Sequence, residues 1–208
     1  MPALILHAPF GERSPVRCHV PADLDVMDDV AFYEWCQEHE TLKIERSPQG
    51  EIEIMSPTGW ETGGRNSEIG CQLHQWSRKD GRGIASDSST GYILPNRAER
   101  SPDASWILKE RLRQIPKEDR RRFLPLCPDF VIELCSPSDS FATLHPKMEE
   151  YIANGTSLGW LIDPDNRTVA IYRPGEEPEV LESPEQVVGE ACLEGFVLDL
   201  GPVFDLDV

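Results

Sequence analysis

A single acid interrupts one of the most apolar stretches of the chain. Residues 130–135 read FVIELC, so Glu133 lies within a run that is typical of a buried strand. An ionised carboxylate in such surroundings is costly unless it is protonated, paired with a cation or bound to a metal. We therefore interpret Glu133 as a functional carboxylate, and the alternative is a structural ion pair in the core.

A second acid and a lysine could complete a site around Glu133. Asp103 lies in another short apolar segment, PDASWI, and the two carboxylates would meet if these segments form neighbouring strands. Two adjacent carboxylates repel unless a cation lies between them, and their oxygens suit Mg²⁺ or Mn²⁺. Such a metal makes a bound water nucleophilic near neutral pH. Lys147 could orient that water, or it could be an ordinary solvated lysine.

The pattern of apolar residues predicts the elements that would position these side chains. Helices are expected over about 21–40, 59–81 and 143–155, with Pro146 in the first turn of the last one and Gly155 ending it. A hairpin is expected over 42–57, and a charged helical insert follows a strand that begins near Asp103. Further strands are expected over 83–94, 130–135 and 158–175.

This order of elements predicts a single α/β domain over residues 1–208, with a mixed central β-sheet flanked by helices. The chain has 208 residues, of which 39% are apolar and 27% charged, as in globular proteins that are soluble in water. Its length suffices for one sizeable core and is short for two. The acidic C-terminal extension is expected to add short strands or to pack on the edge of the sheet.

Charge is unevenly distributed along the chain. The formal net charge is −17, which disfavours a protein that coats nucleic acid generally. Residues 149–208 carry a net charge of −12, whereas residues 97–122 carry +4. Within that basic segment, Arg120, Arg121 and Arg122 could contact nucleic-acid phosphates, or they could only solvate a loop.

The cysteines and the N-terminus indicate a cytoplasmic protein. Six cysteines are scattered without CxxC pairs, which argues against a zinc ribbon and a redox dithiol and favours free thiols. The N-terminal stretch MPALILHAPFGERSP lacks a basic start, so we expect no signal peptide. No apolar run approaches the roughly 20 residues that a membrane span needs, and no membrane contact is expected.

Three stretches of the sequence carry a resemblance to a known family: SPDASWI, PDFVIELCSPSD and KMEEYIANGTSLGWLIDPDNRTVAIYRPG. Together they resemble the restriction endonuclease family often called Uma-two, which belongs to the PD-(D/E)XK nuclease superfamily. The resemblance runs from about Glu34 to Gly175. It implies a restriction-endonuclease-like core over about 34–175, with a metal site on the central strands and the N-terminal helix and C-terminal extension packed on it.

Carried over by position, the resemblance implies that Asp103 is the acid of the PD element and Glu133 the acid of the (D/E)XK element. The pattern has lysine two residues after that second acid, where this chain has Cys135, and Lys147 on the following helix takes the lysine's role. Superfamily nucleases often add an acid from the helix before the sheet. We prefer Glu68 over Glu61 for that role, and a solvated helix acid is the alternative.

Three functions follow from these observations. The first is a Mg²⁺- or Mn²⁺-dependent DNA endonuclease, with a homodimer as the plausible form because a duplex has two strands to cut. The second is a nuclease-like binding or scaffold protein without activity, which the acidity and the missing in-strand lysine favour. The third is a two-carboxylate glycosidase, which the aromatic content of 8% and the missing signal peptide disfavour.

Overall fold

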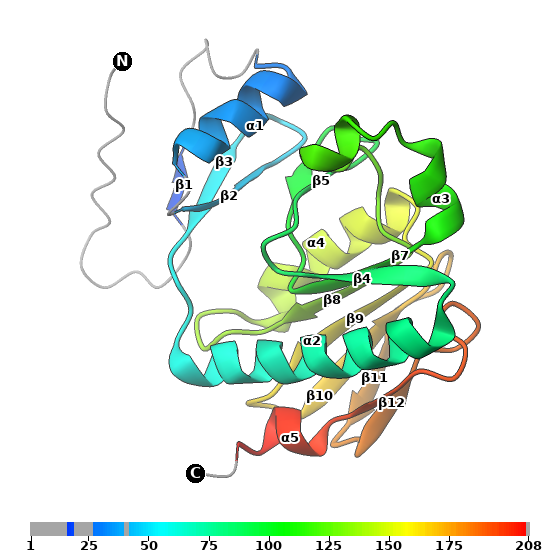
Figure 1. The fold of residues 1–208 in the computed structure, drawn as a ribbon. Coiled ribbons are helices and arrows are strands. Elements are labelled where there is room, and N and C mark those ends of the chain that lie inside the picture. Colours follow the sequence, from blue (N-terminus) through cyan, green and yellow to red (C-terminus); the bar gives the residue numbers. More distant parts are fainter. Residues whose placement is uncertain (1–15, 19–26, 40–41, 207–208) are drawn as a thin grey trace.

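The computed structural model describes residues 16–18, 27–39 and 42–206. The first part of the helix expected over 21–40, and the N-terminal stretch judged to lack a signal peptide, lie outside these residues. Figure 1 shows the remaining elements in chain order: β1 (Val16–Cys18), α1 (Asp29–Glu38), β2 (Lys43–Arg46), β3 (Ile52–Met55), α2 (Trp60–Asp80), β4 (Gly83–Asp87), β5 (Tyr92–Ile93), β6 (Glu99–Arg100), β7 (Ala104–Leu108), α3 (Lys109–Gln114), β8 (Phe130–Leu134), α4 (Phe141–Ala153), β9 (Leu158–Asp163), β10 (Thr168–Tyr172), β11 (Glu179–Glu182), β12 (Gln186–Val188), β13 (Val197–Asp199) and α5 (Gly201–Phe204).

The centre of the molecule is a mixed sheet of six strands in the order β11-β10-β9-β8-β7-β4. Strands β8 and β9 run parallel, and the crossover between them is α4, while the other neighbours are antiparallel. A parallel pair needs a long connection of this kind, which explains why a helix separates two adjacent strands. The predicted fold class, α/β with a mixed central sheet flanked by helices, is confirmed.

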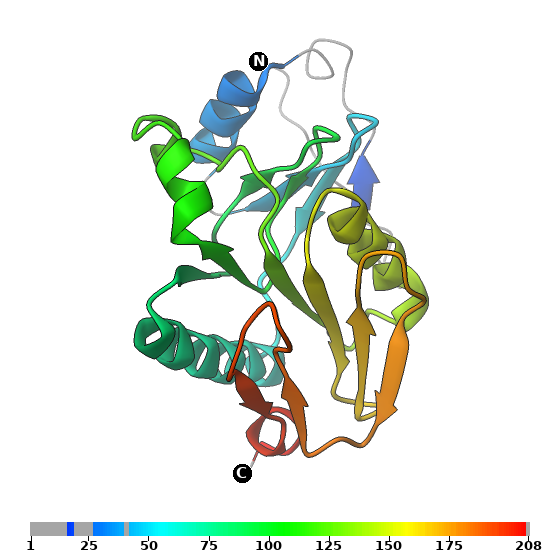
Figure 2. The same ribbon diagram turned by 90° about the vertical axis from the view of Figure 1, so that its right-hand side faces the viewer.

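The two faces of this sheet are covered by different helices, α2 and α5 on one side and α4 on the other (Figure 2). Alternate residues of β8 divide between them: Phe130 and Ile132 pack on the α2 side, and Val131 packs on the α4 side. Both faces are buried, so β8 is apolar along its whole length except at Glu133. The hairpin β12–β13 of the C-terminal extension closes the α2 side, where Phe196 stacks on Trp160.

A second sheet carries the predicted hairpin. Its order is β1-β3-β2-β6-β5, with all neighbours antiparallel. Helix α1 packs on it through a small apolar cluster that includes Phe32, Ile44 and Ile52. The pairing of β2 with β6 matters for function, because β6 leads directly into β7 of the central sheet and so places the hairpin beside β7 and β8.

Helix ends follow their local chemistry. Helix α2 ends at Gly81, whose φ of 75° favours glycine, as the sequence predicts. Helix α4 starts earlier than predicted, because Ser140 and Thr143 form a capping box. Pro146 therefore lies in the second turn, a correction to its expected first-turn position. Gly155, with φ of 108°, follows the C-cap as expected. Within the described part of the chain, no helix is both long and apolar enough to cross a membrane.

Gly83 is a tight point in the packing of the central sheet and supplies a stability prediction. A Cβ added at Gly83 would lie 2.1 Å from Cε2 of the buried Trp106 indole. We expect Gly83→Ala to lower the free energy of unfolding by roughly 1–3 kcal/mol, because the rigid ring must move. The matched control is Gly70→Ala in α2, where nothing lies within 4 Å. It should stabilise the protein by about 0.5–1 kcal/mol. Denaturant unfolding measures both, and changes of the same sign would contradict this packing argument.

Candidate functional site

Glu133 and Asp103 lie on the same face of the central sheet. The register pairs Ala104 of β7 with Ile132 of β8, so Asp103 and Glu133, the next residues outward, are level with each other. The Leu134 N–H donates a hydrogen bond of 2.9 Å to Asp103 Oδ2, which fixes this carboxylate at the end of β8. The two segments are therefore neighbouring strands, as the sequence analysis required.

Lys147 reaches Glu133 from the crossover helix. Its Nζ lies 3.0 Å from Glu133 Oε1, and the same oxygen accepts a 2.9 Å hydrogen bond from Tyr151 OH, one turn further along α4. Helix α4 connects β8 to the parallel β9 and packs on the face of the sheet that carries Val131. Glu133, two residues further along β8, points to the same face. The structure thus brings together three of the four residues predicted as catalytic.

A residue that sequence reasoning missed, Glu45, lies on the other side of the lysine. Lys147 Nζ is 3.1 Å from Glu45 Oε1, and Glu45 is only 1% exposed. The sequence assigns this stretch only to a hairpin, and Glu45 is not among the candidate site residues inferred from it. Pairing of β2 with β6 turns Glu45 onto the site, and no spacing in the sequence signals this.

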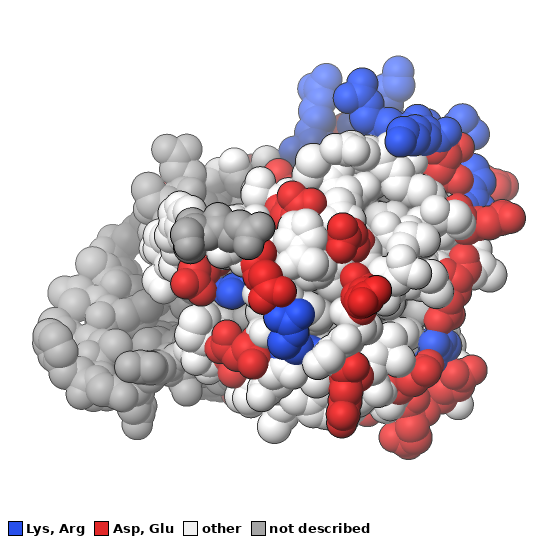
Figure 3. All heavy atoms as spheres, turned by 90° about the horizontal axis from the view of Figure 1, so that it is seen from below, with Lys and Arg blue, Asp and Glu red and all other residues white. Residues whose placement is uncertain are grey.

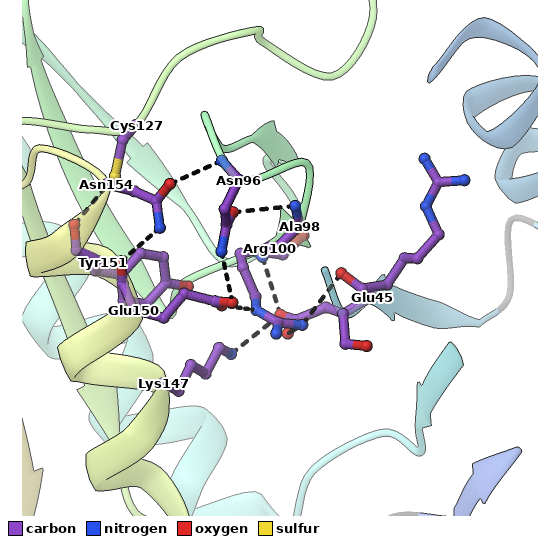
Figure 4. Close-up of polar contacts among 12 residues, drawn as sticks. Glu45, Asn96, Ala98, Arg100, Cys127, Lys147, Glu150, Tyr151 and Asn154 are labelled. Atoms are coloured by element: carbon purple, nitrogen blue, oxygen red, sulfur yellow. Dashed lines mark hydrogen bonds and ion pairs between the residues drawn. The ribbon is translucent and has the colours of Figure 1, made fainter. Parts of the chain in front are cut away.

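A polar network braces Glu45 and joins the hairpin sheet to α4 (Figure 4). Arg100 Nη1 lies 3.6 Å from Glu45 Oε2, and Arg100 Nε donates a 2.6 Å hydrogen bond to Glu150 Oε2. Asn96 Nδ2 donates to Glu150 Oε1 at 3.0 Å, and its backbone N–H donates to Asn154 Oδ1 at 2.8 Å. These contacts join residues 96–100 to residues 150–154 of the chain and so fix both segments near Lys147.

The electrostatics show two carboxylates sharing one ammonium. Burial raises the pKa of Glu133 to about 7, and repulsion from Asp103 and Glu45 adds to this, while Lys147 acts in the opposite direction. Burial would also raise the pKa of Glu45, but Lys147 and Arg100 together hold that pKa below its ordinary value. The pKa of Lys147 is raised because the attraction of both glutamates outweighs its burial. A cation near Glu133 would relieve the remaining repulsion.

These groups lie in a cleft of about 1170 Å³ between the β2–β3 hairpin, the start of α2 and the start of α4. Seven acidic and three basic side chains line the cleft. They are Glu45, Glu51, Glu53, Asp103, Glu133, Asp139 and Glu150, with Lys43, Arg100 and Lys147. This excess of oxygen anions favours bound cations and disfavours a polyanion that enters without them.

The donor set fits a hard divalent cation. Asp103 and Glu133 offer carboxylate oxygens at one point of the cleft, and Asn66 of α2 adds an amide whose Nδ2 is 3.3 Å from Asp103 Oδ1. The Oδ1 of Asn66 is buried without a hydrogen-bond partner among the described residues. The described residues hold no group of three or more His, Cys, Asp and Glu side chains arranged for a metal, so two carboxylates and neutral oxygens are what this site offers.

The structure places Glu68 and Glu61 away from these residues. Glu68 accepts a hydrogen bond from Gln72 at 2.9 Å, and Glu61 pairs with Arg65 at 3.3 Å. Neither lines the cleft, whereas Asn66, between them on α2, does. The helix before the sheet therefore contributes to the site through an amide. Asn66 is missing from the site residues predicted from the sequence, because only acids were considered on this helix.

The arginine run lies outside the cleft. Arg120 and Arg121 are exposed in a short 3₁₀ turn, Arg122 pairs with Asp119 at 2.8 Å, and the Arg121 carbonyl accepts a hydrogen bond from Tyr33 of α1. Acidic side chains are scattered over the face seen in Figure 3, whereas most lysines and arginines on it gather at one margin. The uneven charge expected from the sequence is thus also uneven in space.

The cysteines whose side chains are described are free thiols. Cys36, Cys127 and Cys135 are buried, Cys192 is half-buried and Cys71 is exposed. The side chain of Cys18 lies outside the described residues. Burial raises the pKa of Cys135 to about 12, so this thiol two residues after Glu133 neither supplies a cation nor acts as a ready nucleophile.

Comparisons with known proteins show the family of this chain and a solved structure with a similar fold. The model of the Uma2 family, described as "Putative restriction endonuclease", matches residues 29–201. Among solved structures, the chain is similar to a protein from Anabaena variabilis described as a putative nuclease belonging to DUF820. That likeness has a TM-score of 0.66 and 25% sequence identity, and it covers 77% of this chain and 89% of the other. Comparison with curated proteins found no match.

Proposed function

Because the chain belongs to the Uma2 family, we propose that it is a divalent-metal-dependent endonuclease that hydrolyses phosphodiester bonds of DNA. One observation carries the proposal: Lys147 Nζ lies 3.0 Å from Glu133, on the sheet face that also presents Asp103. Two acids at level positions, one just before β7 and one in the neighbouring β8, could hold the metal, and a lysine over Glu133 could stabilise the developing charge.

In this proposal, Asp103 and Glu133 hold Mg²⁺ or Mn²⁺, with Asn66 as a further oxygen donor in the place first suggested for Glu68. The bound metal would lower the pKa of a water and neutralise a phosphate oxygen. Lys147 orients the attacking water and stabilises the negative charge that develops on the phosphate. Tyr151 holds the Glu133 carboxylate through its 2.9 Å hydrogen bond to Oε1, and the other oxygen, Oε2, would bind the cation.

The proposed activity is tested by nicking of supercoiled plasmid with metal added and removed. We expect relaxed plasmid with Mn²⁺ or Mg²⁺ and none after EDTA treatment, with activity restored by adding the metal back. Asp103→Asn, purified in the same way, controls for a contaminating nuclease. Equal nicking by wild type and this variant would contradict the proposal.

DNA binding is proposed to involve the basic segment around Arg120, Arg121 and Arg122. Replacing all three with glutamine should weaken DNA binding, and the slope of log K against log salt should fall by up to about 3, one for each lost phosphate contact. Fluorescence anisotropy over a salt series measures this slope. Arg78→Gln, on an exposed residue at the end of α2, is the matched control. An unchanged slope in the triple variant would assign these arginines to a solvated loop.

A second function is favoured by two observations, the buried Cys135 in place of an in-strand lysine and the acidic cleft. It is a nuclease-like protein that binds without cutting. Salt-sensitive DNA binding with no nicking under any metal would support it. A homodimer and a cytoplasmic location remain part of the leading proposal, supported by the two strands of a duplex and by the free thiols. Sedimentation analysis tests the dimer.

A further inference from the structure

The ammonium of Lys147 lies between carboxylates from two different sheets. It is 3.0 Å from Glu133 of the central sheet and 3.1 Å from Glu45 of the hairpin sheet. An ammonium has three donors and can serve both carboxylates at once. The same lysine therefore has two possible anchors, and the two differ in how firmly they are held.

Glu45 is the better fixed of the two carboxylates. Its Oε1 accepts the Ser101 N–H at 2.9 Å as well as the Lys147 ammonium, and its Oε2 faces Arg100 at 3.6 Å. Arg100 is in turn held by Glu150, which lies three residues after Lys147 on α4 (Figure 4). Glu45 is thus braced by β6 and, through Arg100, by the helix that carries the lysine.

Glu133 cannot serve the ammonium and a metal equally well. Lys147 and Tyr151 both contact Glu133 Oε1, and a divalent cation on this carboxylate would repel the nearby ammonium. A lysine with Glu133 as its sole partner would compete with the cation or be expelled from the site. Glu45 provides a second buried anion at nearly the same distance, so the ammonium can stay.

We propose that Glu45 is a positioning residue, which retains the ammonium of Lys147 beside the reacting phosphate while Glu133 coordinates the metal. This role rests on the proposed nuclease function and goes beyond it, because it assigns to the hairpin sheet a part in catalysis. If Glu45 had a purely structural role and only fastened the hairpin to α4, the effect of replacing it would be the same with and without Lys147.

A double-mutant cycle separates the two roles. The proteins are wild type, Glu45→Gln, Lys147→Met and the double variant, and the measurements are Mn²⁺ affinity by calorimetry and kcat and KM for plasmid nicking. We expect Glu45→Gln alone to lower kcat by about 10–100-fold and to leave the KM for DNA within about twofold. In the Lys147→Met background the same change should lower kcat by less than about twofold, because its effect passes through the ammonium.

Mn²⁺ affinity gives a readout that does not depend on turnover. Of the two glutamates that contact the Lys147 ammonium, only Glu133 is left when Glu45 is replaced. The ammonium then competes with the metal for Glu133, so we expect Mn²⁺ affinity to fall by about tenfold. Lys147→Met should remove most of that difference. Glu99→Gln is the matched control, because Glu99 is equally buried on β6 but pairs with Arg46. Its effect should be the same with and without Lys147, and Glu45→Asp, which keeps the charge, should recover part of the loss in kcat.

The outcomes distinguish this inference from the proposed function. If wild type binds Mn²⁺ and nicks DNA, but Glu45→Gln has the same fold effect in both backgrounds, the positioning role is overturned and the nuclease stands. If wild type neither binds Mn²⁺ nor nicks DNA, both are overturned. Strong non-additivity of Glu45 with Lys147, together with additivity of Glu99 with Lys147, supports the proposal.

Discussion

Glu133→Gln should abolish Mn²⁺ binding in the cleft and lower plasmid nicking by roughly 10³-fold or more, since a metal supplies several kcal/mol of transition-state stabilisation. Glutamine is nearly isosteric and can still accept the hydrogen bond from Tyr151. Lys147 keeps its contact with Glu45, so no buried charge is left without a partner. The loss should therefore be one of metal binding. Calorimetry and nicking assays on the same preparation measure it.

The matched control for Glu133→Gln is Asp129→Asn. Asp129 is a buried acid immediately before β8, where it pairs with Arg111 at 2.8 Å and accepts the Leu108 N–H. Its replacement should lower stability, because the buried carboxylate loses its ion pair with the half-buried Arg111, and should leave Mn²⁺ affinity unchanged. Mn²⁺ binding that survives in Glu133→Gln would remove Glu133 from the metal site and with it the central part of the proposal.

The raised pKa of Glu133 also predicts how stability depends on pH in metal-free protein. The unfolded chain releases this proton near the ordinary pKa of 4.5, whereas the folded protein holds it to about 7. The unfolded state therefore binds fewer protons between these values. From this group the free energy of unfolding should fall by roughly 3 kcal/mol as pH rises from 4.5 to above 7.

The difference between wild type and Glu133→Gln isolates this contribution. The pKa of Glu45 is lowered and that of Lys147 raised, so both contribute outside this pH window. The pKa of Glu99 is raised by burial, but this contribution is common to both proteins. Denaturant unfolding at several pH values measures the slope, and identical slopes in the two proteins would show that Glu133 is ionised throughout the window.

Lys147→Met should lower kcat by about 10²–10³-fold, the cost of removing one donor to the developing charge. Mn²⁺ affinity should be retained or should increase, because the ammonium that competes for Glu133 is gone. A low kcat with retained Mn²⁺ affinity distinguishes Lys147 from the metal ligands, because replacing a metal ligand should lower both kcat and Mn²⁺ affinity. Single-turnover nicking with saturating Mn²⁺ measures kcat without the contribution of product release.

Lys117→Met, at an exposed lysine of the insert between α3 and β8, controls for the loss of one positive charge. Wild-type kcat in Lys147→Met, or a loss of Mn²⁺ binding equal to that of Glu133→Gln, would contradict the assignment. The first result would show that Lys147 does not orient the attacking water. The second would make Lys147 part of the metal site's framework.

The sequence by itself determined the main helices and strands around the site and the central acid. Local chemistry fixes the ends of α2 and α4, because Gly81 and Gly155 adopt backbone angles that favour glycine. The apolar run around Glu133 specifies a strand buried on both faces, and a carboxylate within it must find a partner wherever the chain goes. The sequence likewise predicted that Asp103, which immediately precedes β7, lies in a second apolar segment and that the helix after β8 folds back over Glu133. The parallel pairing of β8 with β9 comes from the structure.

Only the tertiary structure decided which groups surround that acid. Glu45 belongs to another sheet, and it reaches Lys147 because β2 pairs with β6, a contact between segments more than 50 residues apart. Asn66 rather than Glu68 faces Asp103, because α2 packs on the sheet through the face that carries Ile69 and Leu73, and Asn66 lies on that face. Periodicity tells which residues share a face of one element, but long-range pairing and helix orientation depend on packing energy summed over the whole core, which no single segment encodes.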